Sequence, residues 1–153
     1  MPRRRIDLVV TVGAAVLVAD QLTKAWALRA LDDGPIGLVG SARLALTYNT
    51  AAAFGLGGAF VPFLALAALV VVVLLVTRSE ATQRPLLAVA GGLVVGGAFG
   101  NLVDRLFRSP GLLRGAVVDF VDLRWWPVFN LADAAITIGC VVLVWSGFRT
   151  RDA

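Results

Sequence analysis

The sequence predicts an all-α membrane protein with four transmembrane helices and a small extracytoplasmic β-sheet. Mean hydropathy is +0.86, and charged residues make up only 16% of the chain. Two long stretches, 44–77 and 86–103, contain no charged residue. A soluble core does not need apolar runs of that length, whereas a helix needs about 20 residues to cross the hydrocarbon of a bilayer. Because no series of alternating ten-residue segments occurs, helices are favoured over a membrane barrel.

Four apolar spans carry this prediction. They are residues 8–28, 59–77, 85–103 and 128–148. The whole chain, residues 1–153, is expected to form a single integral-membrane domain. The first span has some features of a cleaved signal peptide, because three arginines precede it and Ala25-Trp26-Ala27 resembles a cleavage site. Asp20 and Lys24, just ahead of that site, argue against this alternative.

The distribution of arginines predicts the orientation of the chain in the membrane. An even number of spans places both termini on one side. Residues 3–5 are all arginine and the short link 78–84 contains two more, which favours the cytoplasm for that side. The longer segments 29–58 and 104–127 would then lie outside. The net charge of +4 therefore suits lipid headgroups, and no nucleic-acid partner is expected.

The two outer segments contain strand-like stretches. Residues 43–48 alternate polar or small residues with apolar ones, and residues 117–123 are similar, so a small sheet on the outer membrane face is expected. A turn is expected at 32–35, Asp-Asp-Gly-Pro. The third span contains five glycines within 91–100, which would let a neighbouring helix or a substrate approach closely.

Asp20 and Lys24 are charged residues inside the first span. Such residues cost roughly 2.5–3.5 kcal/mol each near the centre of a transmembrane helix and are therefore functional candidates. Their i, i+4 spacing puts them on one helix face, where they can pair. The simplest explanation is a salt bridge near the interface, and such a pair could also support a site.

Further polar residues gather near the outer ends of the spans. They are Asn49, Asn101, Asp104, Arg105, Asp119, Asn130 and Asp133. Each has an ordinary structural explanation, as a turn residue, a solvated helix end with a local ion pair, or a strand end. Asn130 and Asp133 in particular have the spacing of a capping box at the start of the fourth helix. Their common level in the membrane nevertheless predicts a functional layer.

The residue types that are missing narrow the chemistry. The chain has no histidine and only one cysteine, which excludes Ser-His-Asp catalysis, HExxH zinc sites and CxxC motifs. A pair of carboxylates that shares a proton remains as a way to hydrolyse a bond. The alternative is an ion or proton conduit, which would need polar residues along the whole membrane depth. The second span has no such residue.

Five motifs resemble those of the lipoprotein signal peptidases, or signal peptidase II, across residues 14–145. They are DQLTK, YNTAAAFG, GGAFGNLVDR, VVDFVDL and FNLAD, in the family's order and spacing. The resemblance implies a four-helix aspartic endopeptidase with a small extracytoplasmic sheet. It also implies removal of signal peptides from prolipoproteins, with cleavage just before a cysteine that carries a diacylglyceryl group.

The resemblance assigns roles to individual residues. Asp119 and Asp133 would be the catalytic pair, with Asn101 and Arg105 contacting substrate. The set expected to bind substrate or support the site is Asp20, Lys24, Asn49, Gly97, Asn101, Arg105 and Asn130. The family's asparagine motif often has glycine where this chain has Ala51. No cofactor and no metal are expected.

The resemblance also implies a location and partners. It places the protein in the bacterial cytoplasmic (inner) membrane as a multi-pass protein, with both termini cytoplasmic and the active site at the extracytoplasmic face. The expected partners are diacylglyceryl-modified prolipoproteins and membrane lipid, and a monomer is expected.

Overall fold

The computed structural model describes residues 5–50, 84–109 and 114–149. The predicted span 59–77 and Ala51 therefore lie outside the described residues. The described helices are α1 (Ile6–Ala30), α3 (Pro85–Phe107) and α4 (Leu131–Arg149), and the strands are β1 (Ile36–Gly37), β2 (Arg43–Asn49) and β3 (Val117–Asp122).

Helices α1 and α3 confirm two of the predicted apolar segments. Helix α1 extends the predicted range by two residues at each end, and α3 begins at Pro85 as predicted and continues to Phe107. Proline suits the first turn of a helix because its missing N–H has no intrahelical partner there. By length and composition both helices are able to cross a membrane. The apolar part of α4, Leu131–Ser146, is shorter.

Helix α4 begins at Leu131, three residues inside the span expected from about residue 128 and directly after Asn130 of the predicted capping box. Phe129 is paired with Val121 in an isolated β-bridge, donating its N–H to the Val121 carbonyl at 3.1 Å. The Phe129 carbonyl accepts the N–H groups of Phe120 and Val121 at 3.1 and 2.9 Å. These hydrogen bonds hold the chain in an extended conformation up to Asn130, and α4 begins only at Leu131.

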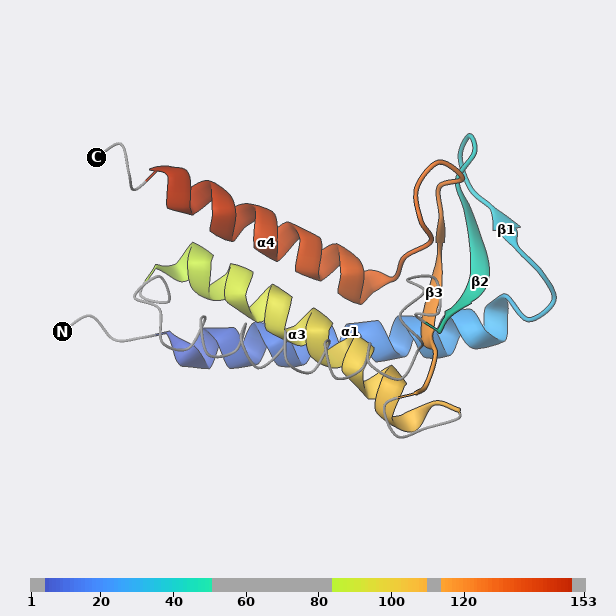
Figure 1. The fold of residues 1–153 in the computed structure, drawn as a ribbon, viewed down its shortest axis with the longest axis horizontal. Helices are drawn as coiled ribbons and strands as arrows, with labels where there is room; N and C mark the ends of the chain where they lie inside the picture. Colours follow the sequence, from blue (N-terminus) through green and yellow to red (C-terminus); the bar gives the residue numbers. More distant parts are fainter. Residues whose placement is uncertain (1–4, 51–83, 110–113, 150–153) are drawn as a thin grey trace.

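Helix α3 packs between α1 and α4, and its glycines make the contacts close (Figure 1). A Cβ atom on Gly96 would lie 2.5 Å from the carbonyl oxygen of Gly13 in α1. A Cβ atom on Gly97 would lie 2.5 Å from the carbonyl oxygen of Ala132 in α4. The prediction that the glycines of this segment admit a neighbouring helix is therefore confirmed.

The antiparallel sheet lies at one end of the helices, with strand order β1-β2-β3 (Figure 1). The predicted strand regions correspond to β2 and β3, whereas the two-residue β1 was not predicted. Phe120 of β3 packs against Ala27 and Leu31 at the end of α1. Because successive strand residues point to opposite faces, this contact turns Asp119 the other way.

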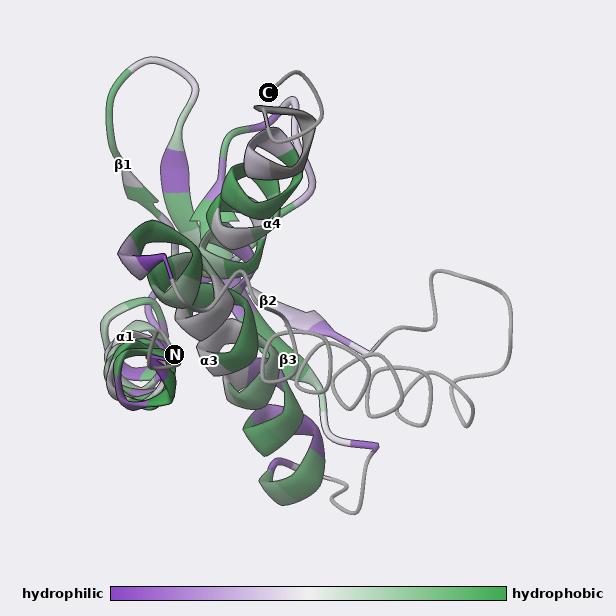
Figure 2. Cartoon of the chain, turned by 90° about the vertical axis from the view of Figure 1, so that its left-hand side faces the viewer, coloured by the Kyte–Doolittle hydropathy of each residue, from purple (hydrophilic) through white to green (hydrophobic). Residues whose placement is uncertain are grey.

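Many residues of the helices are hydrophobic (Figure 2). On α4 the exposed large apolar residues are Ile138, Val141, Val144 and Trp145, and on α1 they include Val18 and Leu22. The buried charged residues, by contrast, lie towards the end of the helices that meets the sheet. This end is where the candidate site is built.

Candidate active site

Asn130 and Asp133 form the predicted capping box at the first turn of α4. The backbone N–H of Asp133 donates to Asn130 Oδ1 at 3.0 Å, and the backbone N–H of Asn130 donates to Asp133 Oδ2 at 3.2 Å. The side chain of each residue thus accepts the backbone N–H of the other, as in a capping box. The structural explanation of this pair is confirmed, and it leaves both side chains with further polar atoms that reach neighbouring elements.

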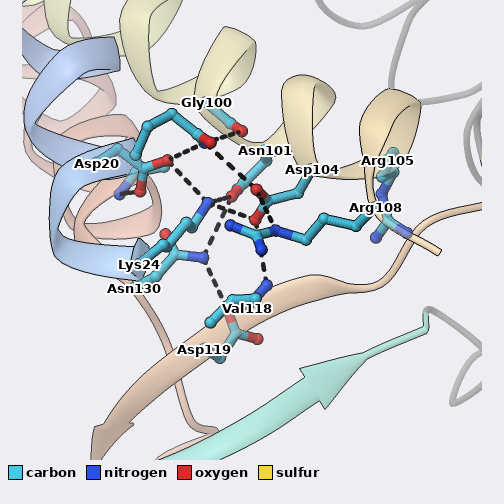
Figure 3. Close-up of polar contacts among 12 residues, drawn as sticks. Asp20, Lys24, Gly100, Asn101, Asp104, Arg105, Arg108, Val118, Asp119 and Asn130 are labelled. Atoms are coloured by element: carbon cyan, nitrogen blue, oxygen red, sulfur yellow. Dashed lines mark hydrogen bonds and ion pairs between the residues drawn. The ribbon is translucent and has the colours of Figure 1, made fainter. Parts of the chain in front are cut away.

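Two asparagine amides link the carboxylates of Asp119 and Asp133. Asn130 Nδ2 donates to Asp119 Oδ1 at 2.6 Å, and Asn101 Nδ2 donates to Asp133 Oδ1 at 2.8 Å. The amides also meet each other, with Asn130 Nδ2 3.2 Å from Asn101 Oδ1. Figure 3 shows part of this chain of contacts, from Asn101 on α3 through Asn130 to Asp119 on β3. The carboxylates therefore belong to one hydrogen-bonded group although they come from different elements.

Asp119 is a buried acid with an altered affinity for protons. Its side chain is only 2% exposed, and burial raises the pKa of its carboxyl to about 6, with the negative charge of Asp133 acting in the same direction. Hydrogen bonds from Asn130 and with Asn49 oppose this rise in the pKa. Asn49 lies at the end of β2, where it pairs with Val117. The structure thus brings the predicted residue Asn49 to the site.

A buried cluster of alternating charges lies beside the two asparagines. Lys24 Nζ is 2.8 Å from Asp20 Oδ2 and 2.9 Å from Asp104 Oδ2. Asp104 Oδ1 in turn lies 2.7 Å from Arg108 Nε. The first three side chains are 0–1% exposed, so the predicted Asp20–Lys24 pair is confirmed as part of a larger group.

Asp20 also connects this charged cluster to α4. Its Oδ1 accepts the backbone N–H of Ala132 at 3.0 Å. The absence of a side chain on Gly100 allows this arrangement, because a Cβ atom there would lie 2.5 Å from Asp20 Oδ2. Asp20 thus links the charged cluster to the first turn of the helix that carries Asp133.

Three further residues of the cluster, Asp104, Arg108 and Gln21, are not among those to which the resemblance assigns a role. A solvated end of α3 was one explanation of Asp104, but its carboxylate is 1% exposed and also accepts the Val118 N–H at 3.2 Å. Gln21 Nε2 donates to the Gly100 carbonyl at 3.1 Å and to Asp104 Oδ1 at 3.3 Å. The i, i+4 spacing of Asp104 and Arg108 was a detectable signal for their ion pair.

Arg105 and Gly97, also predicted, occupy different places on α3. Arg105 is 9% exposed, and its Nη1 lies 3.5 Å from the Gly115 carbonyl, a long contact. Its charge acts on Asp119 and Asp133 through space. Gly97 packs directly on α4, as described above. Arg105 thus contributes a positive charge near the two acids, and Gly97 allows α3 and α4 to approach closely.

An apolar groove of about 430 Å³ opens next to Asp133. Trp125, Trp126 and Phe129 line it together with the first turns of α4, and Asp133 is the one charged residue of its lining in the described part of the chain. The two indole rings are exposed and meet edge to face, with centroids 6.2 Å apart. An extended apolar ligand in this groove would therefore lie against a carboxylate.

The fold and the site define a class of protein. It is a helical membrane-type protein in which a carboxylate of strand β3 and a carboxylate in the first turn of α4 belong to one hydrogen-bonded group, and the second of them lines an apolar groove. This arrangement is suited to acid–base chemistry. Within the described residues, no group of three or more histidine, cysteine or acidic side chains is placed to hold a metal ion. The family model of signal peptidase (SPase) II matches residues 12–149, and the chain belongs to this family.

Relatives named lipoprotein signal peptidase support this assignment. The chain is 44% identical to the Mycolicibacterium smegmatis protein over 145 residues, which covers 94% of this chain and 62% of that relative. It is 43% identical to the Mycobacterium avium protein, covering 94% of the chain and 80% of the relative. It is 44% identical to the Rhodococcus jostii protein, and the match covers 93% of this chain and 72% of that relative. The chain thus spans less than two thirds of the first of these relatives.

Two solved structures share the fold, and both are described as bacterial membrane enzymes. One, solved by the in meso method at 1.9 Å, has a TM-score of 0.79 and 25% identity and covers 95% of this chain and 96% of its own. The other, solved at 2.3 Å, has a TM-score of 0.75 and 23% identity and covers 92% of this chain and 87% of its own. At this identity, the second structure shows only that the fold is similar.

These comparisons confirm the family predicted from the sequence motifs. The name of the relatives agrees with the predicted function, signal-peptide removal in lipoprotein maturation, and the conduit alternative is not favoured. A membrane-enzyme fold with a small antiparallel sheet is likewise confirmed. The four transmembrane spans, the single domain and the role of each site residue stay predictions.

Proposed function

We propose that this protein removes signal peptides from prolipoproteins as an aspartic endopeptidase, with Asp119 and Asp133 as the catalytic pair. Membership of the signal peptidase II family supports a peptidase. The observation that carries the aspartic mechanism is the linkage of the two carboxylates through Asn101 and Asn130. Cleavage would occur just before the cysteine that bears the diacylglyceryl group.

The geometry supports a division of work between the two acids. Asp119, whose pKa is raised to about 6, takes up a proton more readily than an ordinary carboxyl, so we assign the shared proton and the polarisation of the scissile carbonyl to this member of the pair. Asp133 takes a proton from water as the water oxygen bonds to the carbonyl carbon. When the carbon–nitrogen bond breaks, the leaving nitrogen receives a proton from the pair. The net reaction consumes one water and returns the dyad to one proton.

The groove beside Asp133 supports a lipid-linked, apolar substrate. Trp125 and Trp126 flank it, and exposed indole rings are typical of membrane interfaces. Each methylene buried by an acyl chain contributes about 0.8 kcal/mol, so two long chains would bind substantially. Substrate binding would involve Asn49, Arg105 and the asparagine pair, with Asp20, Lys24 and Gly97 supporting the site.

The proposed topology has four transmembrane helices, including residues 59–77, in a single domain of residues 1–153. Helix α1 begins and α4 ends at the end of the helices opposite the sheet, which supports placing both termini on one side (Figure 1). With cytoplasmic termini in the bacterial inner membrane, the site lies at the extracytoplasmic face. A monomer surrounded by lipid completes the proposal, with no nucleic-acid partner.

The test is cleavage of a lipidated prolipoprotein by the purified protein in detergent. We expect release of the signal peptide, with much slower release from the same precursor without the diacylglyceryl group. Asp133→Asn serves as the inactive control. Absence of cleavage by the unmodified, folded protein would overturn the proposed activity, and equal turnover of both precursors at low concentration would overturn the lipid requirement.

A further inference from the structure

Lys24 makes one contact that charge balance alone does not require. Its ammonium, fully buried, meets the carboxylates of Asp20 and Asp104 at 2.8 and 2.9 Å. Its third contact is the neutral amide oxygen of Asn101, at 3.0 Å. Arg108 already supplies Asp104 with a second positive partner at 2.7 Å. The Lys24–Asn101 contact therefore points to a role other than neutralising buried acids.

The contact determines which way the Asn101 amide faces. The oxygen and nitrogen ends of an amide have nearly the same shape, so their partners decide the orientation. An ammonium can only donate, so it holds Asn101 Oδ1 on its own side. Nδ2 must then point the other way, where it donates to Asp133 at 2.8 Å.

Asn130 is oriented by its own helix and supports the same orientation of Asn101. Its Oδ1 is held by the backbone N–H of Asp133 at 3.0 Å, and its Nδ2 meets Asn101 Oδ1 at 3.2 Å. That Nδ2 also donates to Asp119 at 2.6 Å. Both carboxylates thus receive an amide N–H, and Asn101 Oδ1 is held between two donors, Lys24 Nζ and Asn130 Nδ2.

We propose that Lys24 is a positioning residue of the catalytic site: it fixes the Asn101 amide so that its N–H group faces Asp133. The inference rests on the proposed function. A flipped Asn101 would turn its oxygen towards Asp133, and two acceptors can share a hydrogen bond only if the carboxyl carries a proton. Together with a protonated Asp119, the dyad would then hold two protons, and no base would remain to accept a proton from water.

Single removal of Lys24 is a poor test because it leaves buried acids without their cation. The variant Asp20→Asn/Lys24→Met instead removes one charge of each sign, keeps the length of the lysine side chain and leaves Asp104 paired with Arg108. Asparagine at position 20 retains an oxygen that can accept the Ala132 N–H. Arg43→Gln/Asp122→Asn is the matched control, because it also removes an ion pair, of 2.7 Å, but on the sheet.

The measurements are kcat, KM, the pH–rate profile and Tm, with a lipidated prolipoprotein as substrate. For Asp20→Asn/Lys24→Met we expect KM within about twofold of the unmodified protein and kcat lower by about 10- to 100-fold. The acidic limb of the profile should move to higher pH. The charged groups around the amides are Asp20 on α1, Asp104, Arg105 and Arg108 on α3, Asp119 on β3 and Asp133 on α4. The variant leaves the net charge of this set, with Lys24 included, unchanged.

The control variant should keep kcat and the position of the acidic limb. Equal losses of kcat in both variants, or a loss in Asp20→Asn/Lys24→Met without movement of the limb, would overturn the positioning role. A loss explained by a lowered Tm or a raised KM alone would overturn it as well. If the unmodified protein cleaves no prolipoprotein, the proposed function itself fails, and that outcome is distinct from the others.

Discussion

Replacing Asp119 by asparagine is expected to abolish cleavage and at the same time to stabilise the protein at neutral pH. Burial raises the pKa of Asp119 to about 6, above its ordinary value of 3.8. Each pKa unit corresponds to about 1.36 kcal/mol, so ionising this carboxyl in the folded protein costs about 3 kcal/mol more than in the unfolded chain. Asparagine carries no charge and avoids this cost, while its oxygen can still accept the Asn130 amide.

The sign of the pH dependence follows from the raised pKa. Below pH 3.8 the carboxyl is protonated in both folded and unfolded protein, so the cost is absent. Above pH 6 the folded protein bears the whole cost. The Tm of Asp119→Asn in detergent should therefore exceed that of the unmodified protein at pH 7.5, and the difference should disappear near pH 4. Initial rates of signal-peptide release, measured on the same samples, should be undetectable.

Asp122, on the same strand, provides a control because its pKa is shifted in the opposite direction. Its hydrogen bond from Arg43 lowers the pKa of the Asp122 carboxyl. A lowered pKa means stabilisation above the pKa of the unfolded chain that is lost as the pH falls. Asp122→Asn should therefore lower Tm at pH 7.5 and keep activity. A Tm for Asp119→Asn below that of the unmodified protein at both pH values, or appreciable residual cleavage, would refute the reasoning.

Three further predictions concern the acids, the helix contact and the groove. Asp133→Asn should abolish cleavage, and combining it with Asp119→Asn should add little, since the two act as one unit; single effects that multiply in the rate assay would contradict this. Gly97→Ala should lower both Tm and kcat because its methyl group would press on the backbone of α4, whereas Gly37→Ala, which meets nothing within 4 Å, should do neither. Trp126→Ala should raise KM with little change in kcat, because Trp126 lines the groove and has no part in the hydrogen bonds between the two asparagines and the carboxylates; an unchanged KM would exclude the groove as a substrate site.

Local spacing was sufficient to predict part of the site. The Asp20–Lys24 pair follows from i, i+4 geometry, and the Asn130–Asp133 box from the preference of helix starts for such residues. The two main strands follow from alternation. Phe129 shows where local pattern fails, because an apolar residue next to a helix can equally belong to a strand bridge.

The contacts between helices could not be predicted from spacing. Lys24 meets Asn101 only because α1 and α3 approach at a particular rotation, which the backbone contact of Gly13 and Gly96 sets. A sequence shows that glycines allow close packing but not which faces meet. For the same reason Asp104 was open to interpretation as a solvated helix end, although the packing of α3 buries it.

The buried charges suggest why the dyad should keep one proton. Asp20, Lys24, Asp104 and Arg108 sum to zero, so the remaining local charges are those of Arg105 and the two catalytic acids. With one proton on the dyad this remainder is also zero, whereas a fully ionised dyad leaves one negative charge in a poorly solvated place.

Arg105→Gln tests this balance by removing the positive charge that acts on both acids. The dyad should then hold its protons more tightly, and both limbs of the pH–rate profile should move to higher pH. Arg105→Lys keeps the charge and should leave the limbs in place, even if the altered shape lowers the rate. If the profile of Arg105→Gln stays where it is, the charge of Arg105 does not set the protonation of the pair, and its contribution must come from direct contact with the substrate.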